Sequence, residues 1–248
     1  MADDPLDSLP RSVQLLWGLQ EQGRRGPKPS LSRDAIVAAA IEIADAEGLG
    51  AVSMARVADQ VGASTMALYR YVANKDELLL LMSDAGIDGP PALPAGASWR
   101  EALTVWGRAV RGVWMRRPWL LHIPVTGPPA GPHNIAWLEA GLSTLVGTGL
   151  TSAERIDVVQ VVTTYLRGEA WLSVDLRAAS TDDPESFALD YGGAFARLID
   201  PERFPELAAI VGEGPFGEPD PVDDHHGAGL EILLDGIARR IEAAAAAG

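Results

Sequence analysis

The sequence predicts an all-α fold, with a small N-terminal three-helix headpiece and a larger C-terminal helical bundle. Hydrophobic residues recur at helical spacing in one segment after another, and no segment shows the alternation of a half-buried strand. The Pro- and Gly-rich stretch DGPPALPAGAS at 88–98 is typical of a linker between domains. We therefore expect three parts: an extension with a basic arm at 1–30, a headpiece at 31–88 and a helical domain at 98–248.

The composition is that of a folded, soluble protein. Of its 248 residues 47% are hydrophobic, and the absence of cysteine excludes disulfides, thiolate metal sites and a cysteine nucleophile. The start, MADDPLDSLP, has no signal-peptide pattern, and no apolar run reaches the roughly 20 residues of a membrane span. We expect a cytoplasmic protein with no membrane partner.

Charge is distributed unevenly along the chain. The formal net charge is −14, yet residues 22–75 contain seven basic and five acidic side chains, a local charge of +2. Both lysines of the chain, Lys28 and Lys75, belong to this segment. The stretch GRRGPKPS at 23–30 combines Gly and Pro with three cations, which predicts an extended basic arm.

Four helices are expected between the arm and the linker. Apolar periodicity, N-cap residues and glycine stops predict the spans 32–48, 53–61, 64–72 and 74–86. The third begins at Ala63 or Ser64, after a tight turn at Gly62. The fourth begins with Asn74-Lys-Asp-Glu77, which has the form of a capping box.

The segments 53–61 and 64–72, joined by a tight glycine turn, form the pattern of a helix-turn-helix. In that motif the second helix enters the major groove of DNA, and its first residues meet base edges. Leu68 and Val72 share one side of this helix and are expected to pack on the core. The side chains left to face outward are those of Thr65, Met66, Ala67, Tyr69 and Arg70.

Every strong pattern beyond the linker is also helical. A tryptophan-containing stripe from Trp99 stops at Pro118, and a capping box at Thr151-Ser-Ala-Glu154 begins a long helix. The expected spans are 99–117, 134–146, 151–179 and 230–246. Weaker pieces lie near 184–211, and a Pro- and Gly-rich loop is expected at 212–227.

The stretch VGASTMALYRYVANKDELL resembles the DNA-binding signature of TetR-type transcriptional regulators. In that family a glycine turn precedes a short recognition helix that ends in Leu-Tyr-aromatic, and an Asn- or Ser-Lys cap follows. The resemblance covers residue 31 to about residue 82, and beyond that only the helical layout. It implies a ligand-responsive regulator, a repressor that binds a pseudo-palindromic double-stranded operator as a homodimer. A small effector would release it from the DNA.

The resemblance also implies roles for single residues. Thr65, Met66, Ala67 and Tyr69 would line the major groove, while Tyr71 and Lys75 would hold phosphates. Packing for Tyr71 and simple solvation for Lys75 remain alternatives, and Arg33 and Arg56 are expected to be surface or ion-pair residues. The remaining expected DNA contacts are Arg24, Arg25, Lys28, Ser53 and Arg70; the arm would enter a flanking minor groove.

Six of the seven tryptophans follow the linker, where they can form core or line a ligand pocket. The resemblance favours a pocket for an apolar or aromatic effector, such as a drug or secondary metabolite. The candidate pocket residues are Trp106, Trp114, His122, Trp137, Tyr165 and Trp171. Arg167 and Glu169 are interpreted either as polar groups in the pocket or as a salt bridge to a partner subunit.

No cofactor, metal site or catalytic activity is expected. The sequence DDHH at 223–226 lies in a Pro- and Gly-rich loop without the helical spacing of a preformed metal site. There is neither a phosphate-binding glycine motif nor a nucleophile elbow.

In the family, the helices from Thr151 and Leu230 form a four-helix dimer interface, and here their stripes include Val158, Val161, Val162 and Leu234. Two alternatives stay open. One is an all-helical small-molecule-binding protein whose headpiece serves protein contacts, and the other is an enzyme of the same fold.

Overall fold

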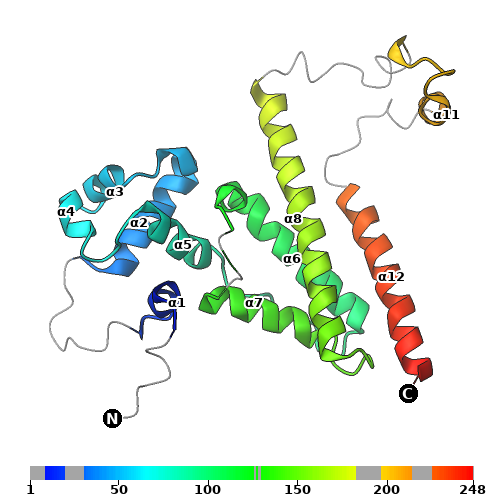
Figure 1. The fold of residues 1–248 in the computed structure, drawn as a ribbon, viewed down its shortest axis with the longest axis horizontal. Coiled ribbons are helices and arrows are strands. Elements are labelled where there is room, and N and C mark those ends of the chain that lie inside the picture. Colours follow the sequence, from blue (N-terminus) through cyan, green and yellow to red (C-terminus); the bar gives the residue numbers. More distant parts are fainter. Residues whose placement is uncertain are drawn as a thin grey trace.

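The computed structural model describes residues 9–19, 31–125, 127, 130–182, 197–213 and 225–247, and every regular element within these ranges is helical (Figure 1). The all-α prediction is confirmed. The arm residues Arg24, Arg25 and Lys28, and the side chains of residues 223–226, lie outside this description. The elements are α1 Arg11–Leu16, α2 Arg33–Glu47, η3 Leu49–Ala51, α3 Met54–Gln60, α4 Thr65–Leu68, α5 Lys75–Ala85, α6 Trp99–Arg116, η4 Pro118–His122, α7 Pro132–Ser143, α8 Ser152–Asp182, α11 Pro205–Glu213 and α12 His225–Ala247.

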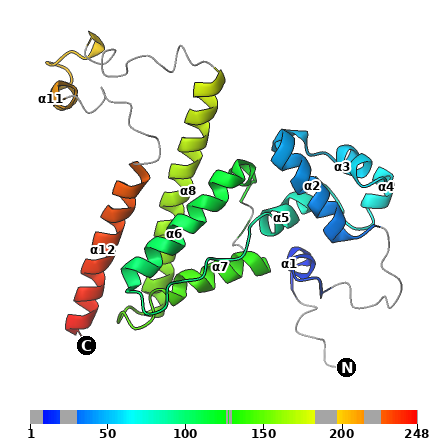
Figure 2. The same cartoon turned by 180° about the vertical axis from the view of Figure 1, so that it is seen from behind.

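The two halves of the molecule are joined through α5. Figures 1 and 2 place α2, α3 and α4 at one end, α8 and α12 at the other, and α5 between them beside α7. Leu78 and Met82 of α5 are fully buried with the headpiece core, whereas the end of α5 contacts α7. Since α5 contacts both halves, a displacement of either half relative to the other changes the contacts of α5.

The second half is a bundle in which α6 and α12 both pack on α8, and Arg100 of α6 forms ion pairs with Glu231 and Asp235 of α12. Gly107 allows this close approach, because a Cβ there would come within 3.2 Å of the Leu166 side chain. Leu103, Leu145 and Leu234 are among the fully buried side chains of this half. The bundle thus has a packed apolar core of its own.

Several element ends differ from the predicted ones. The α-helical part of α4 ends at Leu68, because the amides of Arg70 and Tyr71 bond three residues back, to Ala67 O and to Leu68 O at 2.8 Å. Pro132 starts α7 two residues earlier than expected, since proline is favoured at a first helical position. At the C-terminal end, α12 begins at His225, five residues before the predicted start.

Candidate DNA-binding surface and ligand pocket

Two serine caps and one glycine turn orient the candidate reading helix. Ser53 Oγ accepts a hydrogen bond from Arg56 N at 3.2 Å, and Ser64 Oγ accepts one from Ala67 N at 3.3 Å. Gly62 adopts φ 65°, a left-handed conformation that a residue with a Cβ rarely takes. These three positions fix the angle between α3 and α4.

The short helix α4 and the turn after it divide cleanly into a buried and an exposed face. Leu68 and Val72 are fully buried, as predicted. Met66 is 76% exposed and Tyr69 45% exposed, and Arg70 is also exposed. Thr65 and Ala67 are half-buried on the same outer side. The structure therefore brings these predicted contact residues together on one small surface.

The neighbouring residues show a mixture of roles. Tyr71 is half-buried and packs against the headpiece core, whereas Lys75 is exposed in the first turn of α5. Asn74 Oδ1 caps α5 by accepting from Glu77 N at 2.8 Å. The predicted capping box is only half formed, because Glu77 Oε1 accepts from Ala73 N at 3.0 Å rather than from the cap residue.

Arg56 belongs to an ion pair, as the sequence indicated. Its guanidinium lies 2.8 Å from Glu47 Oε1, and the hydrogen bond to Glu47 raises the pKa of Arg56. Both side chains are about half exposed, so the pair contributes little to stability.

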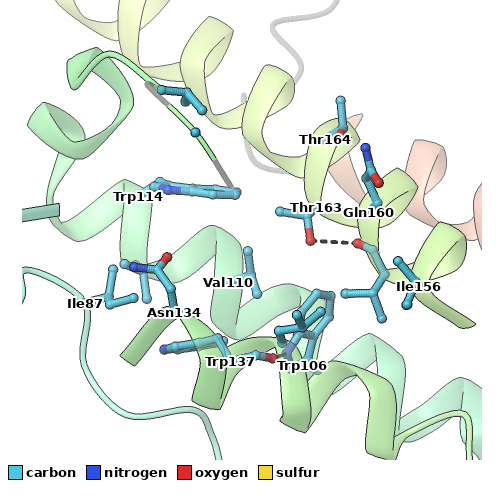
Figure 3. Close-up of a pocket in the computed structure, with 15 residues that line it drawn as sticks. Ile87, Trp106, Val110, Trp114, Asn134, Trp137, Ile156, Gln160, Thr163 and Thr164 are labelled. Atoms are coloured by element: carbon cyan, nitrogen blue, oxygen red, sulfur yellow. Dashed lines mark hydrogen bonds between the residues drawn. The ribbon is translucent and has the colours of Figure 1, made fainter. Parts of the chain in front are cut away.

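A cavity of about 580 Å³ opens between α6, α7 and α8 (Figure 3). Its wall is mainly aliphatic and aromatic, and it includes three of the predicted tryptophans, Trp106, Trp114 and Trp137. The polar side chains on the wall are those of Asn134, Gln160, Thr163 and Thr164. This size and lining are those of a site for a drug-sized ligand.

Hydrogen bonds hold two of the pocket tryptophans. Trp106 Nε1 donates to Trp137 O at 3.0 Å, and Trp137 Nε1 donates to Asp88 O at 2.6 Å. Gly141 allows the Trp106 ring to lie against α7, because a Cβ there would come within 2.8 Å of the ring. The indole N–H groups are thus satisfied, so the rings can present apolar faces to a ligand.

The other three predicted pocket residues lie elsewhere. His122 is exposed at the end of η4, and Trp171 is 49% exposed on α8. Tyr165 packs against Gly229 of α12, and burial raises the pKa of its hydroxyl. Tyr165 and Trp171 do not line the cavity because α8 turns a different face toward it.

That face carries residues that sequence reasoning missed. Ile156, Val159, Gln160, Thr163 and Thr164 recur at i, i+3, i+4, i+7 and i+8 and all line the cavity. Their spacing is visible in the sequence, but a stripe that mixes polar and apolar residues does not stand out from solvent-facing positions.

Glu169 forms an ion pair within the chain, which neither interpretation of this residue had foreseen. Its carboxylate accepts two bonds from Arg111 of α6, at 2.6 and 3.3 Å, and a third from Ser173 Oγ at 2.8 Å. Arg167 lies over the ring of Trp114, 5.9 Å from its centroid, and donates to Leu121 O. Burial lowers the pKa of Arg167.

The stripes assigned to a dimer interface are partly wrong. Val158, Val162 and Leu234 are buried inside the single chain, where α8 meets α6 and α12. Val161 is 51% exposed, and a different set of apolar side chains on α8 and α12 faces outward with it: Trp171, Leu172, Leu176 and Ile232.

The described part of the chain lacks two further features. No group of three His, Asp or Glu side chains there could hold a metal ion, and none of its helices has the length and apolar character needed to cross a membrane.

Comparison with known families agrees with this architecture. Residues 36–82 match the family described as bacterial regulatory proteins, tetR family, and residues 90–241 match the tetracyclin repressor-like C-terminal domain. The chain belongs to the TetR family. This TetR-family chain is therefore a DNA-binding transcriptional regulator rather than an enzyme, which confirms the resemblance seen in the sequence.

Individual relatives extend over nearly the whole regulator. The transcriptional repressor DrrR1 of Streptomyces coeruleorubidus is 36% identical over 237 residues, which are 92% of this chain and 85% of DrrR1. The repressor Rv1353c of Mycobacterium tuberculosis is 27% identical over 239 residues, 93% of this chain and 88% of the relative.

Among solved structures, ActR of Streptomyces coelicolor is similar to this regulator without ligand and in complex with actinorhodin. In both states the TM-score is 0.71 at 27% identity, covering 87% of this chain and 99% of ActR. A further ActR structure, with (S)-DNPA, has a TM-score of 0.69 and covers 85% of this chain and 98% of ActR.

Proposed function

We propose that this regulator represses transcription in the cytoplasm by binding a pseudo-palindromic operator as a homodimer, and that a planar aromatic effector releases it. The observation that carries the proposal is the tryptophan-lined cavity beside α5, the helix that joins the pocket half to the headpiece. Occupancy of such a cavity can shift the headpiece only if the two DNA-binding states differ in their affinity for the effector.

The lining favours a particular class of effector. Trp114 borders the cavity with a half-buried ring, and the buried rings of Trp106 and Trp137 form part of its apolar wall. Gln160 and Thr164 of α8 offer polar groups to the same cavity. A fused-ring aromatic compound that carries a few hydroxyl or carbonyl groups matches both features. The ActR complexes support this class, because actinorhodin and (S)-DNPA are the compounds found with that relative.

The proposed DNA contacts are those on the exposed face of the headpiece. Met66 and Tyr69 are exposed large side chains there, and Arg70 and Lys75 add the cations that phosphates require. Thr65, Ala67 and Ser53 would complete the contact, and the arm with Arg24, Arg25 and Lys28 would reach the adjacent minor groove.

A double substitution tests the DNA contacts. Operator fragments are first selected from random DNA with the wild-type dimer, and binding is then followed by gel shift. Tyr69→Ala with Lys75→Ala should weaken operator binding at least tenfold, because a groove contact and a phosphate contact are both lost. Arg239→Ala, which removes an exposed cation from α12, is the matched control. Equal binding by the double variant and the control would refute the assignment.

The effector class is tested with actinorhodin as the probe. Added to the wild-type operator complex, it should release the DNA, and Trp114→Ala should require a higher concentration because the pocket loses one ring. Calorimetry without DNA should show the same order of affinities. Tight operator binding that no fused-ring aromatic compound reverses would exclude the proposed effector class.

The dimer is tested at its exposed apolar face. Leu172 is 54% exposed on α8, and Leu172→Glu should yield a monomer with weak operator binding, since dimerisation supplies the second reading helix. Val146→Glu, at a residue 68% exposed in the loop after α7, is the control. Sedimentation that shows a dimer for Leu172→Glu would place the interface elsewhere.

A further inference from the structure

The first turn of α7 is capped by a carboxylate that comes from another helix. Asp84 of α5 accepts from Asn134 N at 3.0 Å and from Asn134 Nδ2 at 2.8 Å through Oδ1. Its Oδ2 accepts from His133 N at 3.4 Å and lies 2.9 Å from His133 Nδ1. The side chain is only 5% exposed. We call these four contacts the Asp84 latch.

The latch supplies what α7 itself lacks. The N-cap residue of α7 is Gly131, which has no side chain to satisfy the free amides at the start of the helix. A carboxylate at this position meets both those amides and the positive end of the helix dipole. Gly131 also permits the approach, since a Cβ there would lie 2.1 Å from Asp84 Oδ1.

The Asn134 side chain contacts both Asp84 and the cavity. Its amide nitrogen donates to Asp84, while its side chain forms part of the pocket wall. Figure 3 shows Asn134 between Trp114 and Trp137, with its nitrogen on the side of Ile87, the residue two positions after α5. Among the described residues, no protein group hydrogen-bonds the Asn134 side-chain oxygen, so it is available to a donor in the pocket.

The other end of α5 carries the headpiece. Asn74 and Lys75 begin the helix next to the reading surface, and Leu78 and Met82 are fully buried against the headpiece core. Because α5 is a continuous helix of 11 residues, a displacement at Asp84 is transmitted along it.

A second attachment of the headpiece lies away from the pocket wall. Asp45 of α2 accepts from Arg117 Nε at 3.2 Å and from Trp119 Nε1 at 2.7 Å. Neither Arg117 nor Trp119 lines the cavity. Arg117 Nη1 also donates to Gly86 O, at the end of α5, at 2.8 Å. The headpiece is therefore attached through Asp84, whose partner Asn134 lines the cavity, and through contacts of Arg117 and Trp119 that do not line it.

We propose that the Asp84 latch transmits pocket occupancy to the headpiece. A hydroxyl group of the effector donates to Asn134 Oδ1, draws the carboxamide toward the cavity and removes Asn134 Nδ2 from Asp84. The weakened cap frees the end of α5 from α7, and the headpiece pivots about the Asp45 attachment. This inference rests on the proposed function, because operator binding is its readout.

A substitution of Asn134 should lower operator affinity in the absence of ligand, as the effector is expected to do. Asn134→Asp places a second carboxylate beside the buried one of Asp84, and two such groups in contact cannot both stay ionised without strong repulsion. The latch should open, and operator affinity should fall about tenfold, within the range of typical coupling between sites. The DNA is the fragment selected by the wild-type dimer, measured by gel shift.

Rescue distinguishes a latch from general damage. The double variant Asp84→Asn with Asn134→Asp restores one amide facing one carboxylate and should bind the operator within about threefold of wild type, as expected for contacting residues that couple. Ile135→Asp adds the same charge in the same turn of α7, at a residue 40% exposed, and should bind as wild type does. Gly131→Ala, which forces a methyl group against Asp84, should weaken binding as Asn134→Asp does.

The outcomes separate the two proposals. If the wild-type dimer selects no operator, the proposed function fails before the latch is tested. If it binds but Asn134→Asp binds equally well, or if the double variant folds by circular dichroism without restored binding, the latch is refuted. Should Asn134→Asp fail to fold, Gly131→Ala decides, and undiminished operator binding by that variant overturns the inference.

Discussion

The headpiece and the pocket half place their functional groups in opposite ways. In the headpiece, Ile36, Val57 and Leu68 fill the interior completely, and the candidate contact groups lie outside on α4. In the pocket half, large aromatic rings surround a space that no side chain fills. In the headpiece, the contact residues are those that the packed core leaves facing outward. In the pocket half, the shape of the cavity depends on how helices distant in the sequence cross.

The largest expected effect concerns the pocket half and its buried ion pair. Glu169→Ala removes the carboxylate that accepts two hydrogen bonds from Arg111, a guanidinium whose side chain is only 10% exposed. The free energy of unfolding should fall by about 3–5 kcal/mol, whereas breaking the exposed pair with Arg56→Ala should leave it nearly unchanged. Chemical denaturation of both variants makes the comparison; equal costs would show that Arg111 finds another partner.

The second prediction concerns Leu68, the fully buried residue of α4 in the headpiece. Leu68→Ala leaves a cavity under α4, at a cost of about 2–5 kcal/mol, and should abolish operator binding. Met66→Ala on the exposed face should change stability by no more than about 0.5 kcal/mol. Calorimetry and gel shift together test this contrast, and a stable Leu68→Ala variant that binds DNA normally would contradict it.

These contrasts also show what sequence could predict. The caps at Ser53, Asn74 and Thr151 and the inward positions Leu68 and Val72 follow from spacing within a few residues. These local signals were sufficient to predict the helices of the headpiece and the family resemblance.

Contacts between distant segments were not predictable in the same way. Asp84 and Asn134 are 50 residues apart, and Arg111 and Glu169 are 58 apart. No local pattern announces such pairs, and their chemistry depends on the crossing of α5 with α7 and of α6 with α8. For the same reason Val162, an apolar residue on a long helix, was assigned to a dimer interface although it is buried within the chain.

The two pocket tryptophans of α6, Trp106 and Trp114, are expected to contribute differently to stability. Trp106 is 2% exposed and packs on Gly141, so Trp106→Ala should cost about 3–5 kcal/mol. Trp114 is half-buried and borders the cavity, so Trp114→Ala should cost only about 1 kcal/mol while weakening effector binding. Denaturation and calorimetry give the two readouts; similar stability losses would mean that the cavity wall is packed as tightly as the core.

The smallest effect concerns the cap of α8. Hydrogen bonds from Thr151 N and Oγ1 hold the pKa of Glu154 below its ordinary value of 4.5, so the folded state favours the ionised form. This stability is present above pH 4.5 and is lost as the pH falls through the lowered pKa. Glu154→Gln should therefore lower Tm slightly at pH 7, and its difference from wild type should shrink as the pH falls below 4.5. Glu139→Gln, on the exposed side of α7, should not reproduce this profile.

The arrangement of tryptophans around the cavity has an optical consequence. Trp106 and Trp137 sit in apolar, hydrogen-bonded surroundings, whereas Trp17 and Trp171 are nearly half exposed. Indole emission shifts to longer wavelength in water, so the buried and exposed rings contribute to different parts of the spectrum. A coloured aromatic compound held among the pocket rings would quench the short-wavelength part selectively. The regulator thus carries its own fluorescent reporter of occupancy, without any added label.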